Sequence, residues 1–126
     1  IWGVKMEMNY VVLGTNNMVE AVRFYNILLA DSGFNQVFAT DRMTYWQKAQ
    51  MTFALAIPFD QAAATNGNGS MLGFGCDSEQ EVGALYHKAL KLGGRCEGEP
   101  GLRGPYYSAY VRDLDNNKLC FGCMLS

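Results

Sequence analysis

The first half of this chain repeats in the second half, without a gap, at an offset of 61 residues. An internal repeat indicates that one supersecondary unit was duplicated, so the fold should contain two equivalent modules. Equivalent positions in the two modules should then surround related surfaces. The matched pairs are Gly14 with Gly75, Glu20 with Glu81, Tyr25 with Tyr86, Leu29 with Leu90, and Gly33 with Gly94.

Each copy of the repeat is predicted to hold a strand, a helix and three further strands. In the first copy an apolar run predicts a strand, and Asn17, three residues before Glu20, predicts the start of a helix that Gly33 ends. Ser78 and Glu81 predict the same helix start in the second copy. Strands are expected over 8–13, 34–40, 43–48, 51–57, 70–76, 95–99, 106–112 and 118–125, with a loop over 100–105.

These elements predict an α+β fold, with two βαβββ modules that form cupped mixed sheets and helices on their outer faces. The modules are expected over 6–58 and 70–126, in one domain of residues 6–126, with a connector over 59–69. A helix covers only one face of such a sheet, so the other face should enclose a ligand or contact a second chain. We therefore expect a homodimer, in which modules pair within a chain or are swapped between chains. Ile1 to Lys5 is treated as a trimmed or added end.

Composition argues against several kinds of partner. The net charge of −2 gives no basic field for nucleic acid or for an anionic membrane. No apolar run approaches the length that spans a bilayer, and no secretory leader is visible. The four cysteines are too sparse for a disulfide scaffold, so a reduced cytoplasmic protein is expected.

Two stretches of the chain resemble a known superfamily. They are Asn9-Tyr-Val-Val-Leu-Gly14 and Tyr107-Ser-Ala-Tyr-Val-Arg-Asp-Leu-Asp-Asn-Asn-Lys-Leu119. With the βαβββ repeat, they make 8–124 similar to the vicinal oxygen chelate superfamily of glyoxalases, bleomycin-resistance proteins and extradiol dioxygenases. Leu114 stands where the family usually has proline, and Asn116 where it has glycine. Because asparagine tolerates the left-handed conformation, the turn is expected to survive.

The resemblance implies positions for one divalent metal, but the side chains there are unsuitable. The positions are Tyr10, Ala54, Met71 and Cys120, and none is His, Asp, Glu or Gln. Such metals need several oxygen or imidazole ligands that converge on one point. The only histidine, His87, falls in the second helix and is expected at the surface. We therefore expect no metal and no cofactor.

The aromatic side chains are the remaining candidates for a ligand site. A mostly apolar cavity with aromatic walls suits a planar or cationic organic molecule. We expect a metal-free small-molecule-binding protein of the bleomycin-resistance kind. One alternative is that these aromatics fill the sheet interior or a dimer seam, and another is an enzyme of the superfamily, metal-dependent or using Cys120. The candidate ligand-facing residues are Tyr10, Tyr45 or Trp46, Ala54, Met71, Tyr107 or Tyr110, and Cys120.

Other motifs favour structural roles. Cys120 and Cys123 match a CxxC pattern, but positions three apart in a strand point to opposite faces, which predicts packing and not redox chemistry. The glycines over 67–69 and 101–104 lack the spacing of a phosphate loop and are expected in turns. Arg112 and Asp113 precede a turn and are expected to be structural, while Glu97 and Glu99 are expected at a solvated edge.

Overall fold

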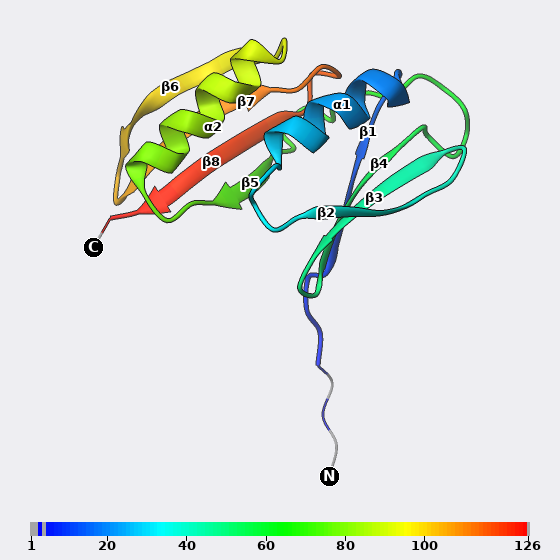
Figure 1. Ribbon diagram of the computed structural model, residues 1–126, viewed down its shortest axis with the longest axis horizontal. Helices are drawn as coiled ribbons and strands as arrows, with labels where there is room; N and C mark the ends of the chain where they lie inside the picture. Colours follow the sequence, from blue (N-terminus) through cyan, green and yellow to red (C-terminus); the bar gives the residue numbers. More distant parts are fainter. Residues whose placement is uncertain (1–2, 4, 126) are drawn as a thin grey trace.

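The computed structural model describes residues 3 and 5–125, and it confirms the predicted α+β fold of two βαβββ modules (Figure 1). Ile1, Trp2 and Val4 of the proposed end segment lie outside the described residues. The first module comprises β1 (Tyr10–Gly14), α1 (Met18–Leu28), β2 (Asn35–Ala39), β3 (Met43–Lys48) and β4 (Met51–Ala56). The second comprises β5 (Leu72–Gly75), α2 (Glu79–Lys91), β6 (Arg95–Arg103), β7 (Tyr106–Arg112) and β8 (Lys118–Met124).

Both helices begin where the sequence predicts. The side chain of Asn17 accepts a hydrogen bond from the backbone N–H of Glu20 at 3.2 Å. Ser78 accepts the equivalent bond from Glu81 at 3.1 Å. Each cap satisfies one N–H group that the first helical turn leaves without a partner. Within the described residues, neither helix is long and apolar enough to cross a bilayer.

The two sheets have the same topology, as the repeat requires. Their strand orders are β1-β4-β3-β2 and β5-β8-β7-β6. In each sheet the first and last strands of the module pair in parallel, and the other pairs are antiparallel. Strands β1 and β5 are therefore equivalent edge strands.

The expected loop over 100–105 is wrong, because β6 continues to Arg103. Pro100 does not end the strand, since β6 is at the edge of its sheet and a missing N–H is tolerated there. Register shifts around Gly98 further adapt the strand to its neighbour β7. Gly104, with a φ of 62°, then takes the left-handed conformation that the short turn requires.

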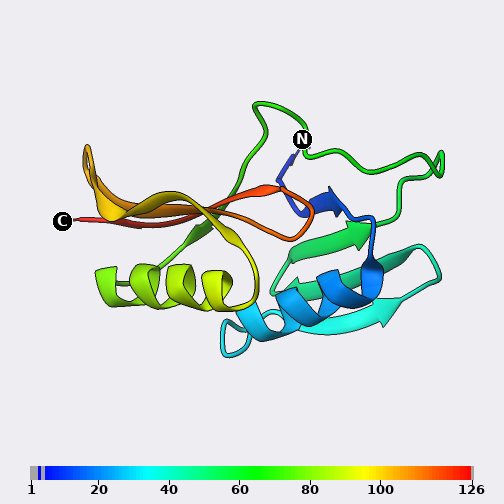
Figure 2. The ribbon, with the colours of Figure 1, turned by 90° about the horizontal axis from the view of Figure 1, so that it is seen from above.

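One hydrophobic core lies between the helices and the sheets and spans both modules. Figure 2 shows both helices along one side of the molecule, each against its own sheet. We call the face of each sheet that is opposite its helix the open face. Residues of α1, α2, β4 and β8 dominate the core, including Phe24, Tyr25, Leu28, Phe53, Leu55, Val82, Leu119 and Phe121.

A buried polar clasp joins the modules at the turn between β7 and β8. The Tyr25 hydroxyl, from α1, donates a hydrogen bond to Asp113 Oδ2 at 2.5 Å. Asn117 Nδ2 donates both to Asp113 Oδ2 and to the carbonyl of Gly14, each at 3.0 Å. Asn116 adopts a φ of 68° in this turn, as the sequence predicts. Arg112 and Asp113 thus serve structure, and the turn positions one module against the other.

Candidate functional site

The open face of the first sheet carries a cluster of aromatic rings. The rings of Tyr10 and Tyr45 are stacked with centroids 6.4 Å apart, and Phe38 meets Tyr45 edge-on at 5.6 Å. Ala54 lies fully buried in a small group with Met43, beside Tyr45. Tyr10 and Phe38 remain 49% and 56% exposed, so this surface can still be covered by a ligand or a protein.

Trp46 does not belong to this surface, which corrects its predicted place in the ligand site. It is next to Tyr45 in β3, and successive side chains of a strand point to opposite faces. Its ring is buried in the core beside Phe53, and its indole N–H donates to Asn26 Oδ1 at 2.9 Å. Of the two predicted alternatives, the structure therefore places Tyr45 on the open face.

The open face of the second sheet brings Tyr110 and Cys120 together as cross-strand neighbours. Two cations lie over the Tyr110 ring, with Arg103 Cζ 5.0 Å and Lys118 Nζ 5.2 Å from its centroid. Gly73, which pairs with Cys120 on the other side, has open space where a side chain would stand. This face therefore combines room for a ligand with positive charge.

The predicted place of Tyr107 in the ligand site is wrong for the same reason as that of Trp46. It is three residues from Tyr110 in β7, so its side chain points to the other face of the sheet. There it is partly buried against the core, opposite Cys123. The sequence did not show which of Tyr107 and Tyr110 faces the ligand site. Ala109 and Val111 are buried in the core, and Tyr107 shares their face of β7, whereas Tyr110 lies on the other face.

A cavity of about 430 Å³ lies at the seam between edge strands β1 and β5. Of the predicted site residues, Met71 alone lines it. Val12, which shares the open face of β1 with Tyr10, and Lys118 of the second sheet also line it. The cavity is therefore lined by both modules, with Val12 from the open face of the first sheet and Lys118 from that of the second.

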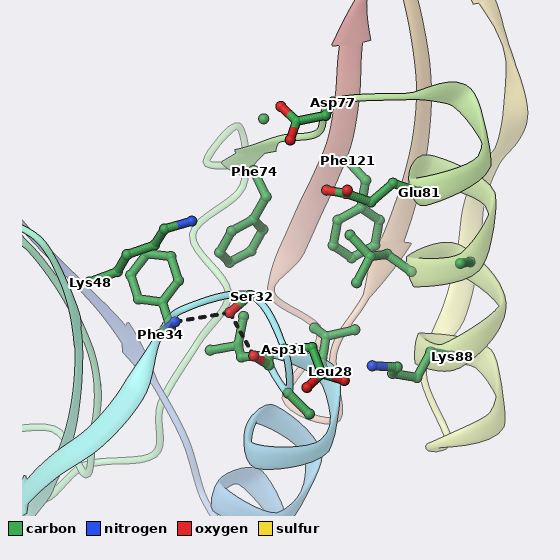
Figure 3. A pocket seen from close by; sticks show the side chains of 15 residues that line it. Leu28, Asp31, Ser32, Phe34, Lys48, Phe74, Asp77, Glu81, Lys88 and Phe121 are labelled. Atoms are coloured by element: carbon green, nitrogen blue, oxygen red, sulfur yellow. Dashed lines mark hydrogen bonds between the residues drawn. The ribbon is translucent and has the colours of Figure 1, made fainter.

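A second cavity, of about 440 Å³, lies on the helix side where the modules meet (Figure 3). Its floor is formed by Phe34, Phe74 and Phe121. The ring centroid of Phe74 lies 6.4 Å from that of Phe34 and 6.0 Å from that of Phe121. Lys48 and Lys88 extend toward it, but Lys88 Nζ donates to the Ile27 carbonyl at 3.1 Å. Sequence reasoning missed this cavity, because its walls come from both modules and the repeat does not show which surfaces meet.

Comparisons with known proteins agree with this fold. Residues 7–121 match the Glyoxalase/Bleomycin resistance protein/Dioxygenase superfamily. The chain belongs to this superfamily. A glyoxalase/bleomycin resistance protein from Albidiferax ferrireducens is 34% identical, with a TM-score of 0.84 and coverage of 92% of this chain and 97% of that chain.

More distant solved structures share the fold of this superfamily member. A hypothetical protein from S. aureus is 25% identical, with a TM-score of 0.74 and coverage of 98% of this chain and 96% of that chain. A lactoylglutathione lyase from Agrobacterium tumefaciens is 18% identical, with a TM-score of 0.72 and coverage of 94% of each chain. Among proteins of curated function, none matches the chain.

The four positions implied for a metal do not fit a divalent cation in this superfamily member. Tyr10 and Ala54 belong to the first sheet, while Met71 precedes β5 and Cys120 is in β8. Within residues 3 and 5–125, no three His, Cys, Asp or Glu side chains converge on a point. His87 is exposed on α2, as the sequence predicts. An alanine and a methionine at two positions leave too few donors for a hard metal ion.

The surroundings of Cys120 favour the protonated thiol. Burial raises the pKa of Cys120 above its ordinary value, although the nearby Tyr110, Arg103 and Lys118 each act to lower it. A protonated thiol is a poor nucleophile. Cys123 lies on the opposite face of β8, buried in the core, so the two sulfurs do not form a CxxC pair and the prediction is confirmed.

Proposed function

We propose that this member of the glyoxalase superfamily binds a planar organic molecule, without a metal, on its open faces. The observation that carries the proposal is the Tyr10, Tyr45 and Phe38 cluster on the open face of the first sheet, where Tyr10 and Ala54 stand at positions that the resemblance gives to metal ligands. Burial and the neighbouring Tyr45 raise the pKa of Tyr10. A tyrosine hydroxyl is protonated at neutral pH in any case, so Tyr10 can donate a hydrogen bond to a ligand.

The aromatic cluster offers enough interaction for useful affinity. Stacked or edge-on aromatic contacts contribute about 0.5–1.5 kcal/mol each beyond the burial of apolar area. Two or three such contacts, with burial in the seam cavity, support a Kd of about 1 µM, which corresponds to about −8 kcal/mol. This affinity suits capture of a small molecule, as in the bleomycin-resistance branch of the superfamily, without chemistry on it.

We expect planar aromatic compounds to raise the melting temperature of the protein and to change its fluorescence. Tyr45→Ala should lower the affinity of a confirmed binder about tenfold, because it removes the ring between Tyr10 and Phe38. Met71→Glu should also weaken binding, because it puts a carboxylate beside the apolar seam cavity. The matched control is Val19→Ala, on the 77% exposed outer surface of α1. Unchanged binding in both site variants would place the ligand elsewhere.

The purified protein should hold no stoichiometric divalent metal, and added zinc, nickel or manganese should leave its melting temperature unchanged. The reason is the donor set at Tyr10, Ala54, Met71 and Cys120, described above. Elemental analysis checks the expectation. About one zinc, nickel, manganese or iron per chain, retained in His87→Ala, would contradict it.

We also propose that the protein is a homodimer in the cytoplasm, where a reducing environment keeps its sparse cysteines unpaired. Large apolar side chains on the open faces and seam, such as Tyr10, Val12, Phe38 and Met71, are between 42% and 56% exposed. Edge strands and exposed apolar surface of this kind favour association. Light scattering at micromolar concentration should therefore give about twice the 14.0 kDa of one chain. A mass equal to that of one chain would refute the dimer.

A further inference from the structure

The open face of the second sheet holds two cations that form no ion pair with a carboxylate of residues 3 and 5–125. Arg103 and Lys118 both lie over the Tyr110 ring. The one ion pair among the described residues joins Arg112 Nε to Glu97 Oε1 at 2.8 Å. Lys118 also acts to lower the pKa of Glu97, but the Glu97 carboxylate is engaged by Arg112. Two like charges so close to one ring repel each other, and a bound anion would relieve that repulsion.

The cationic group is held in place by the backbone. Arg103 donates to the carbonyls of Ser108 and of Glu99, the latter at 2.8 Å. Carbonyl acceptors fix the guanidinium but leave its full charge uncompensated. The guanidinium of Arg103 lies over the Tyr110 ring, so this ring is not free to receive a cationic ligand.

A glycine creates the space in which this group sits. A Cβ atom at Gly98 would lie 2.9 Å from the Tyr110 ring and 3.0 Å from Arg103 Nη2. Any side chain at this position would therefore displace the ring or the guanidinium. The bulge in β6 around Gly98 brings the two side chains together across the strands.

We infer that Arg103, Lys118 and Tyr110 form an anion-binding subsite, and that the ligand is a planar aromatic molecule bearing a carboxylate. Arginine and lysine bind carboxylates through charge-assisted hydrogen bonds, which are about twice as strong as neutral ones. Lys118 also lines the seam cavity with Val12 and Met71, so an apolar body in the cavity places its charged end beside Lys118. The inference rests on the proposed function and narrows its ligand from any planar organic molecule to one that carries a negative charge.

Three probes that share the naphthalene ring and differ in the charge of one substituent test the inference. 2-Naphthoate, 2-naphthamide and 2-naphthylmethylamine would be titrated into the protein at low and high salt, with binding measured by calorimetry. The naphthoate should bind at least tenfold more tightly than the amide, and the amine most weakly. Higher salt should reduce the advantage of the naphthoate, because exposed charges are screened.

Variants test whether Lys118 and Arg103 cause the preference for the anionic probe. Lys118→Met should reduce naphthoate affinity about tenfold and leave amide affinity unchanged, whereas Lys91→Met, on the outer end of α2, should change neither. Gly98→Ala should lower naphthoate affinity by displacing Arg103, with the melting temperature monitored for folding. Equal affinity of acid and amide would overturn the anion subsite while leaving the proposed function intact. No binding of any probe would overturn both.

Discussion

Replacing Asp113 with alanine should lower the free energy of unfolding by about 3–5 kcal/mol. The carboxylate is buried and accepts hydrogen bonds from the Tyr25 hydroxyl, from Asn117 and from the backbone N–H of Asp115. Its removal leaves several buried donors unsatisfied and opens the clasp between the modules. Urea unfolding followed by circular dichroism measures the change.

Two conservative variants control this experiment. Tyr25→Phe removes one donor and should cost about 1–2 kcal/mol, since the carboxylate keeps its other bonds. Asp113→Asn tests the charge, because burial raises the pKa of Asp113 despite the hydrogen bonds that lower it. Because the pKa of Asp113 is higher in the folded than in the unfolded state, its protonation contributes to the free energy of unfolding. This contribution is complete below about pH 4 and is lost as pH rises through the folded-state pKa. The stability difference between wild type and Asp113→Asn should therefore shift with pH in that window. A pH-independent difference would contradict the raised pKa.

Gly94→Ala should destabilise the protein by about 2–3 kcal/mol. A Cβ at this position would lie 2.8 Å from the carbonyl oxygen of Arg112 and 2.9 Å from that of Ala89. Both contacts are with backbone, so no side-chain rotation relieves them. Thermal and chemical unfolding should show the loss.

The matched control for Gly94 is Gly83→Ala. Gly83 lies inside α2, and a Cβ there would meet no atom within 4 Å. Alanine should therefore stabilise the helix by about 1 kcal/mol, because glycine is the poorer helix former. If both variants change stability in the same direction, the predicted steric clash at Gly94 is wrong.

The fold was accessible from the sequence because the repeat and local signals agree. The side-chain caps at Asn17 and Ser78 and the left-handed Asn116 appear where expected. The site was less accessible, because it depends on which of two adjacent strand residues points to the open face. A one-residue difference moves a side chain to the other face, and this separates Tyr45 from Trp46.

Of the two cations beside Tyr110, only one could be placed from the sequence. Alternation along β8 places Lys118 on the same face as Cys120, so that residue was within reach of sequence reasoning. Arg103 was not, because Pro100 and the neighbouring glycines predict a loop where β6 in fact continues. An edge strand tolerates a proline and a bulge, but a single sequence does not show which strand is at an edge.

The clasp at Asp113 also breaks the symmetry left by the duplication. Only the second module has the long turn that supplies this carboxylate, since β3 and β4 of the first are joined by Ala49 and Gln50 alone. Tyr86, the counterpart of Tyr25, has Cys96 and not an aspartate as its neighbour. The two halves are therefore no longer interchangeable. A chain made of two first halves would lack the carboxylate that joins them, so the second half carries folding information that the first half does not contain.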